Sequence, residues 1–201
     1  MNLRPIKNIL LASLFAVVTL HAAAVEPHEM LKSAVDEVLA IAYRSDPTTV
    51  RLSERIRPTL NKYFNFEAIT RRAIGPGWRQ FTAEQQKRAT ALFSDVVIRN
   101  YADRFEAGDR PGITYSPAVI PDSKRPSLRE LATTIDYSGK KYSVVYRVEQ
   151  SGDNWRIYDV IIEGVSMIAN WRAQLDPIYQ KGGAPAVIKS LEQTLSLPFS
   201  G

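Results

Sequence analysis

The spacing of apolar side chains changes twice along the chain, from a helical period to a strand period and back. In the first half, apolar residues recur every three or four positions, which predicts amphipathic helices over 27–44, 50–63, 64–74 and 82–107. Pro58 should kink or split the second helix, and the Gly-Pro-Gly stretch at 75–77 should end the third. Thr82 and Gln85 have the spacing of a capping box, so the longest helix should begin there.

After Pro111 the period shortens to two residues. Alternating apolar side chains predict four strands, over 113–120, 128–137, 141–150 and 155–162. Short turns join them, and because parallel strands need long crossovers, we expect an antiparallel meander. Pro117 cannot donate a ladder hydrogen bond, so the first strand should lie at an edge or contain a bulge.

A strand-to-helix corner follows the last strand. Gly164 can take backbone angles that other residues avoid, and Ser166 is a suitable N-cap for the next helix. Helical spacing returns over 167–179, and the glycine pair at 182–183 separates this helix from a last one over 184–195. The predicted fold is α+β, with N-terminal helices, a four-stranded antiparallel meander sheet, and C-terminal helices packed on the sheet.

Residues 1–24 have the pattern of a secretory signal peptide. Arg4 and Lys7 precede an apolar run, and the alanines at 22–24 offer a cleavage site. The run is only about a dozen residues long, shorter than the ~20 that a membrane-spanning helix needs. We therefore expect cleavage before Val25 and an exported protein that consists of a single domain over 25–201.

Charge and residue inventory argue against several functional classes. The net charge of +5 falls to +3 without the leader, which holds two basic residues and no acidic one. The basic residues that remain after the leader are spread along the chain, whereas a nucleic-acid binder concentrates its basic residues in one patch. The sequence contains no Cys, so disulfides and thiolate chemistry are not expected. His28 is the single histidine after the predicted leader, so the usual metal sites are not expected either.

Two polar side chains near the corner, Ser166 and Asp159, are of types that act as nucleophiles or ligand groups in other proteins. Ser166 follows Gly164 as in a nucleophile elbow, but Ile168 stands where that motif requires a second glycine. We therefore interpret Ser166 as a helix cap. Asp159 lies in an otherwise apolar strand, and we interpret it as a partner for Arg147 or Arg172, or as a structural cap, rather than as a ligand group.

The helices carry more apolar surface than one face of one sheet can cover. A dry, packed core and a cavity lined by the same residues both explain this surplus, and composition alone does not choose between them.

Two blocks of sequence resemble a known family. The first block is the stretch WRIYDVIIEGVSMIANWRAQL, which begins at Trp155. The second comprises Tyr63-Phe64-Asn65-Phe66, Ile69-Thr70-Arg71, Gly77-Trp78-Arg79 and Thr82-Ala83-Glu84-Gln85-Gln86. In this order, and with coverage of nearly all of the chain after the leader, they resemble the MlaC family of periplasmic phospholipid shuttle proteins, also called toluene-tolerance proteins.

The resemblance implies a periplasmic carrier that holds diacyl phospholipid in an apolar cavity between sheet and helices, with no cofactor and no catalytic residue. The implied partners are an outer-membrane lipoprotein–porin complex and an inner-membrane ABC transporter complex with its substrate-binding subunit. Lipid passing between them would maintain the lipid asymmetry of the outer membrane. Four basic residues are either docking contacts for these partners or part of a solvated surface, namely Arg71, Arg72, Arg79 and Lys87.

Carried over to this chain, the lipid cavity would be lined by inward residues of the later strands and of the helices that cover them. These candidate lipid-binding residues are Val97, Tyr101, Tyr142, Val144, Tyr146, Ile157, Ile161, Met167, Ile168 and Trp171. Two other functions remain open. A cone-shaped α+β enzyme would need titratable groups inside its pocket, and a periplasmic chaperone or adaptor would need an exposed apolar groove for protein.

Overall fold

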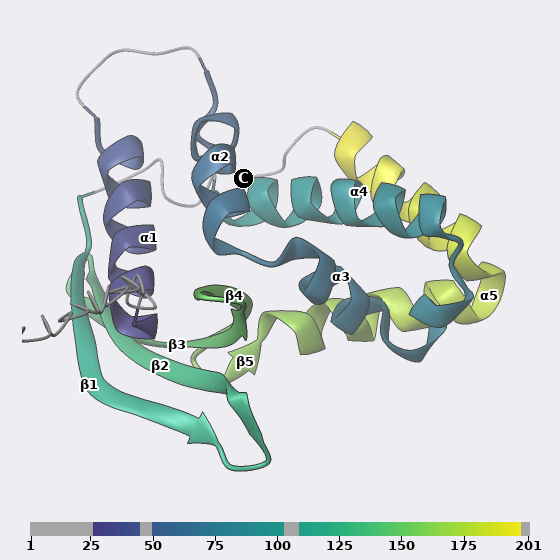
Figure 1. The fold of residues 1–201 in the computed structure, drawn as a ribbon. Coiled ribbons are helices and arrows are strands. Elements are labelled where there is room, and N and C mark those ends of the chain that lie inside the picture. Colours follow the sequence, from purple (N-terminus) through teal and green to yellow (C-terminus); the bar gives the residue numbers. More distant parts are fainter. Residues whose placement is uncertain (1–25, 45–49, 103–108, 198–201) are drawn as a thin grey trace, which may run out of the picture.

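A computed structural model describes residues 26–44, 50–102 and 109–197 (Figure 1). The predicted signal peptide lies outside these ranges. The elements, in order, are α1 (Pro27–Ala42), α2 (Leu52–Tyr63), α3 (Phe66–Ile74), the 3-10 helix η1 (Gly75–Gln80), α4 (Ala83–Ala102), β1 (Gly112–Asp122), β2 (Arg125–Tyr137), β3 (Lys140–Ser151), β4 (Asn154–Ile162), β5 (Val165–Ser166) and α5 (Met167–Ser196). Within the described ranges, no helix combines the length and apolar character needed to cross a membrane.

The sheet is an antiparallel meander in the order β1-β2-β3-β4-β5. The α+β class and the meander are confirmed, but the sheet has five strands where four were predicted. The extra strand arises because Glu163 and Gly164 both take positive φ angles, of 50° and 80°, which turns the corner back on β4. Val165 can then pair with Ile162. The register of the edge strand β1 shifts around Pro117, as its missing N–H predicts.

Local signals set the helix ends. Thr82 and Gln85 form the predicted capping box, in which the Thr82 N–H donates to Gln85 Oε1 at 2.9 Å and the Gln85 N–H donates to Thr82 Oγ1 at 3.2 Å. Pro58 lies inside α2 without splitting it. In α5 the backbone leaves helical angles only at Gly182 and Gly183, which separates two helical halves as predicted.

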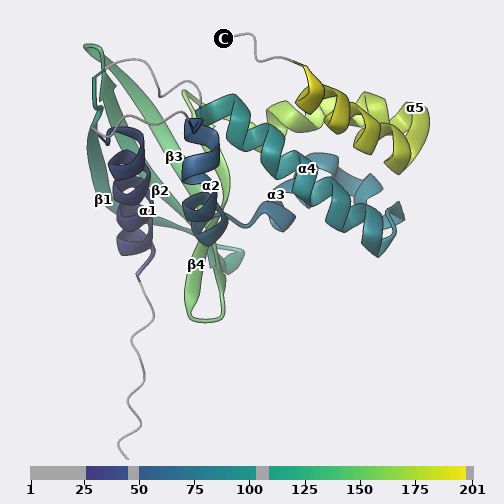
Figure 2. The ribbon, with the colours of Figure 1, turned by 90° about the horizontal axis from the view of Figure 1, so that it is seen from above.

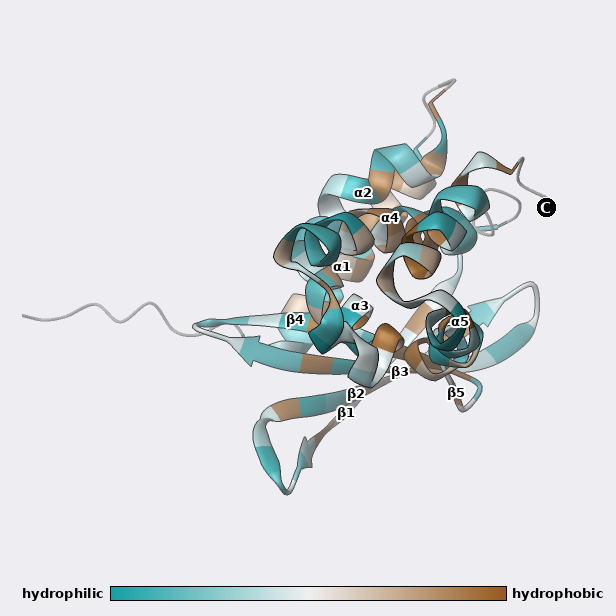
Figure 3. Ribbon diagram, turned by 90° about the vertical axis from the view of Figure 1, so that its right-hand side faces the viewer, coloured by the Kyte–Doolittle hydropathy of each residue, from teal (hydrophilic) through white to brown (hydrophobic). Residues whose placement is uncertain are grey.

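The buried side chains form two clusters. One joins α1 to the sheet, and the other lies among α2, α3, α4 and α5. Figure 2 shows α1 and α2 against the sheet and the remaining helices to one side, and Figure 3 shows α1, α2 and α4 on one side of the strands. After its first turns on β4, α5 packs on α3 and α4 rather than on the sheet.

Candidate functional site

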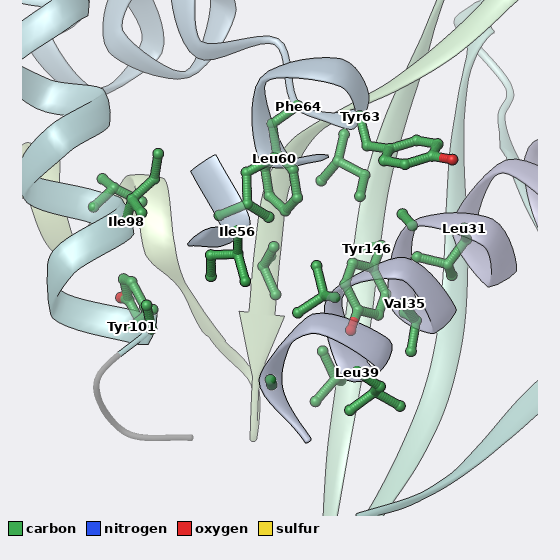
Figure 4. A pocket seen from close by; sticks show the side chains of 18 of the residues that line it. Leu31, Val35, Leu39, Ile56, Leu60, Tyr63, Phe64, Ile98, Tyr101 and Tyr146 are labelled. Atoms are coloured by element: carbon green, nitrogen blue, oxygen red, sulfur yellow. The ribbon is translucent and has the colours of Figure 1, made fainter. Parts of the chain in front are cut away.

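An apolar cavity of about 220 Å³ lies between the two clusters, where the sheet faces α1, α2 and α4. Among the described residues, no charged side chain lines it, and the polar residues of its lining are Tyr43, Tyr63, Tyr101 and Tyr146. Figure 4 shows Val35 and Leu39 of α1 close to Tyr146 of the sheet. The apolar lining residues are Leu31, Ala34, Val35, Val38, Leu39, Ala42, Leu52, Ile56, Leu60, Phe64, Phe66, Val97, Ile98, Ala102, Pro111, Ile113, Ile135, Val144, Ile157, Val160, Ile162 and Met167.

The chain after α2 fixes one end of this cavity. The Asn65 N–H donates to the carbonyl oxygen of Ile157 at 2.8 Å, beside a parallel bridge between Phe64 and Ile157. The Asn65 side chain also donates to Glu149 Oε1, at 2.8 Å, and caps α3. These bonds anchor α2 to the sheet. Helix α1 packs on α2 and meets the sheet through side chains of its own buried cluster, and the cavity lies beside this contact, between the apolar stripe of α1 and the strands.

A bulge in β4 decides which side chains of that strand enter the cavity. Val148 pairs with Ile157 and Arg147 pairs with Asp159, so Tyr158 is an extra residue without a partner. Side chains alternate along a strand, and one extra residue reverses the faces of all that follow. Val160 therefore lines the cavity together with Ile157, and Ile161 joins Asp159 on the opposite face.

Six of the ten candidate lipid-binding residues line the cavity, namely Val97, Tyr101, Val144, Tyr146, Ile157 and Met167. The other four lie outside its lining. Tyr142 is on the cavity side of β3 but beyond the lining, and the bulge turns Ile161 away. Ile168 and Trp171 belong to the helical cluster, where the Trp171 ring meets Phe93 edge-on at 5.2 Å. A role in lipid binding stays a prediction for all ten.

The sequence reasoning missed the walls formed by α1 and α2. The stripe of α1, from Leu31 to Ala42, is regular enough to be recognised, but it was given no place in the site. Its position above the strands, rather than in a closed helical core, depends on contacts between segments far apart in sequence.

Asp159 is a structural residue, as its interpretation predicted. The residue is 2% exposed, and its carboxylate accepts hydrogen bonds from Ser166 Oγ at 2.7 Å and from the Ile168 N–H at 3.1 Å. Arg147 Nη1 lies 3.3 Å away. Arg172, the other predicted partner, donates instead to the backbone carbonyl of Arg72. Asp159 therefore ties the bulged strand to the start of α5.

Ser166 is the N-cap of α5. Its hydroxyl donates to Asp159 and accepts from the Ala169 N–H at 3.1 Å. His28 Nε2 lies 2.9 Å from the backbone oxygen of Ser116, on the other side of the fold. Among residues 26–44, 50–102 and 109–197, no group of three or more His, Cys, Asp or Glu side chains is placed to hold a metal ion.

Two tyrosines between α1 and the sheet should make stability sensitive to alkaline pH. Burial raises the pKa of Tyr146 to about 12, and burial likewise raises the pKa of Tyr115 to about 12. In the unfolded chain these hydroxyls ionise near pH 10. Their contribution to folding is therefore complete below pH 10 and is lost as the pH rises to 12.

We expect the free energy of unfolding to fall between pH 10 and 12, with a loss of about 2 kcal/mol from Tyr146. Urea unfolding of the wild type and of Tyr146→Phe measures this loss, and comparison of the two cancels the titration of lysines. The same pH dependence in both proteins would contradict the assignment.

Comparisons with known proteins agree with this geometry. The family model described as "MlaC protein" matches residues 32–193. The toluene tolerance protein ttg2D of Pseudomonas putida is 26% identical over 181 residues, covering 87% of this chain and 82% of that protein. The intermembrane phospholipid transport system binding protein MlaC of Haemophilus influenzae is 22% identical over 195 residues, covering 92% of this chain and 89% of that protein.

A solved structure has the same fold. It is the phospholipid-binding protein from Ralstonia solanacearum in complex with a phospholipid, with a TM-score of 0.75 and 24% sequence identity. The match covers 85% of this chain and 97% of that one. At this level of identity, the likeness supports the architecture of sheet and helices.

Proposed function

The chain belongs to the MlaC family, and on that premise we propose that it is a carrier that holds the acyl chains of a phospholipid in its apolar cavity. One observation carries this proposal: nine elements of the fold, α1 to α5 and β1 to β4, line the cavity, and none of the described residues in this lining is charged. Burial of hydrocarbon contributes about 0.8 kcal/mol per methylene, so the acyl chains supply the binding energy and the headgroup remains near solvent.

The size of the cavity indicates how lipid enters. About 220 Å³ exceeds the ~150 Å³ of an apolar cavity that holds benzene, but it lies below the ~300 Å³ at which sites for larger ligands begin. Acyl chains of full length therefore require the cavity to widen. The boundary between α1 and the strands is the candidate for this widening, because α1 is held there by side-chain contacts, whereas the end of α2 is tied to β4 through the backbone of Asn65.

The arrangement also favours a carrier over an enzyme. In the described part of the chain, the polar residues that line the cavity are tyrosines, whereas a cone-shaped enzyme would place acids or bases there. Both Ser166 and Asp159 are engaged in the cap of α5. In this proposal the protein catalyses no reaction and needs no cofactor, and phospholipid is its cargo.

We further propose that the carrier works in the periplasm, between an outer-membrane lipoprotein–porin complex and an inner-membrane ABC transporter complex, and so maintains outer-membrane lipid asymmetry. Three points support this: the signal-peptide pattern of residues 1–24, the membership of the family, and the name of the Haemophilus relative as the binding protein of an intermembrane phospholipid transport system.

Transfer of a fluorescent phospholipid between two vesicle populations tests the carrier function. We expect the mature protein to speed transfer in proportion to its concentration, because each molecule shields acyl chains from water. Buffer and a protein without an apolar cavity serve as controls. Transfer no faster than in buffer, by a protein shown to be folded, would reject the carrier function and favour a chaperone or adaptor.

A further inference from the structure

A second cavity, of about 690 Å³, lies against the opposite face of the sheet. Its walls come from the end of β1 and the turn between β1 and β2, from β2, β3 and β4, from α3 and from the start of α5. Unlike the apolar cavity, it is lined by five arginines and three acids. The sheet itself separates the two cavities.

The three acids of this second cavity are already paired. Asp122 lies 2.7 Å from Arg125, and Glu130 lies 2.8 Å from Arg147. Arg147 also contacts Asp159, whose carboxylate is further occupied by the cap of α5. With five arginines and three acids, the described lining has a net charge of +2. Arg72 is paired with Glu149 outside the lining, so Arg129 and Arg172 are the arginines without an acidic partner.

These other arginines have donors to spare. Among the described residues, the hydrogen bonds of Arg129 and Arg172 go only to backbone carbonyls, at 2.8 Å to Leu128 and at 2.9 Å to Arg72. The Arg129 guanidinium also lies over the Trp155 ring, 5.4 Å from Cζ to the ring centroid. Arg72 pairs through Nη2 with Glu149 at 3.1 Å, but its Nη1 is buried and has no partner in the described part of the chain. A buried guanidinium donor without an acceptor costs free energy, so the charge of Arg72, rather than this covered Nη1, is what the residue brings to the wall of the cavity.

Tyr158 adds a neutral donor to the same wall. Its ring lies under the guanidinium of Arg72, 4.0 Å from ring centroid to Cζ, and the residue is 8% exposed. The Tyr158 hydroxyl makes no hydrogen bond within the described ranges. The bulge explains its position, because Tyr158 is the extra residue of β4. The Tyr158 hydroxyl is therefore available to donate to a group in the cavity.

We propose that this second cavity binds a phosphate group. The donors of Arg72, Arg129, Tyr158 and Arg172 come from four different elements, α3, β2, β4 and α5. Donors on separate elements suit an anion with several oxygens in a tetrahedron better than a planar carboxylate with two. The phosphate belongs either to a small free molecule or to a phospholipid headgroup at a membrane surface, which the exposed Ile120 beside the cavity would contact.

NMR titration of the full mature chain with inorganic phosphate tests the site, with acetate at equal ionic strength as the comparison anion. We expect saturable shifts of the side-chain Nε–Hε signals of Arg72, Arg129 and Arg172. Arg129→Gln and Tyr158→Phe should each weaken phosphate binding about tenfold or more. Tyr158→Phe keeps the ring under Arg72, so it probes the hydroxyl without loss of packing.

Arg88→Gln is the matched control, because Arg88 pairs with Glu192 on an exposed helical surface outside the cavity. Phosphate shifts that never saturate, equally tight acetate binding, or equal weakening by Arg88→Gln would each overturn the phosphate site. Tighter binding of acetate would instead indicate an acidic side chain of a protein partner.

Sedimentation with phosphatidylglycerol vesicles separates the two sources of phosphate. Loss of vesicle binding in Arg129→Gln but not in Arg88→Gln identifies a headgroup, whereas phosphate binding without vesicle binding identifies a small free molecule. Because the sheet separates the cavities, phospholipid carried by these variants in the apolar cavity should equal that of the wild type. Failure of the phosphate site therefore leaves the proposed carrier function standing.

Discussion

Val160→Trp should reduce the phospholipid carried by the purified protein about tenfold or more. Val160 is half-buried, lines the apolar cavity from β4 and pairs across the sheet with Tyr146. An indole at this position fills space that acyl chains need, and the ~1–3 kcal/mol typical of overpacking corresponds to about a tenfold to hundredfold loss of affinity. Lipid phosphorus per mole of protein, after organic extraction, measures the effect.

Val145→Trp is the matched control for this substitution. Val145 lies one residue before Tyr146, is also half-buried, and pairs with Ile161 on the opposite face of the sheet. The same added volume there leaves the apolar cavity unchanged. Circular dichroism should show both variants to be folded, and equal lipid contents in the two would show that the cavity is not the lipid site.

Asp159→Ala should lower the free energy of unfolding by about 3 kcal/mol. The substitution removes the acceptor for Ser166 Oγ and for the Ile168 N–H. It also removes the buried carboxylate that pairs with the Arg147 guanidinium. Removal of one member of a buried pair costs ~3–5 kcal/mol, and the lower figure applies because Arg147 keeps Glu130. Urea unfolding at pH 7 measures the loss.

Glu130→Gln is the control, since it removes the other carboxylate from the same arginine. The side chain of Glu130 is 37% exposed, whereas that of Asp159 is 3% exposed. Removal of the Glu130 carboxylate should therefore lower the free energy of unfolding by under about 1 kcal/mol. Equal losses in the two variants would refute the role of Asp159 as the link between β4 and α5. Folded Asp159→Ala should still carry phospholipid, whereas an enzyme that used Asp159 would lose its activity.

Most of the fold follows from signals that act over a few residues. The capping box of Thr82 and Gln85, the helix stop at Gly75 and the break at Gly182 and Gly183 depend on neighbours in sequence, and all lie where they were expected. The antiparallel order follows from short turns. These local features form as predicted because no contact between distant segments of the chain conflicts with them.

The site was less predictable, because a single extra residue in β4 decides its geometry. Strict alternation assigns Ile157 and Ile161 to the same face, whereas the bulge at Tyr158 places Val160 and Ile162 on the side of Ile157. A bulge depends on the register with the neighbouring strand, and nothing in the local sequence marks it. The two-residue strand β5 escaped prediction for the same reason, since only its pairing with β4 defines it.

The division of apolar residues between core and cavity was equally hidden. Trp171 and Val144 are both large or branched, both buried and both in the recognised pattern, yet one packs against Phe93 and the other lines the cavity. Burial in a packed core and burial in the wall of a cavity require the same kinds of apolar side chain. Only the positions of α1 and α2 above the sheet distinguish them.

Native mass spectrometry of the mature protein, purified from cells without detergent, tests the central claim most directly. The account predicts a folded protein whose mass exceeds that of the chain by one or two phospholipids, with the excess lost after organic extraction. The Val160→Trp variant should show mainly the mass of the chain alone. A wild-type protein that is folded, has only the mass of the chain and takes up no phospholipid from vesicles would contradict the account.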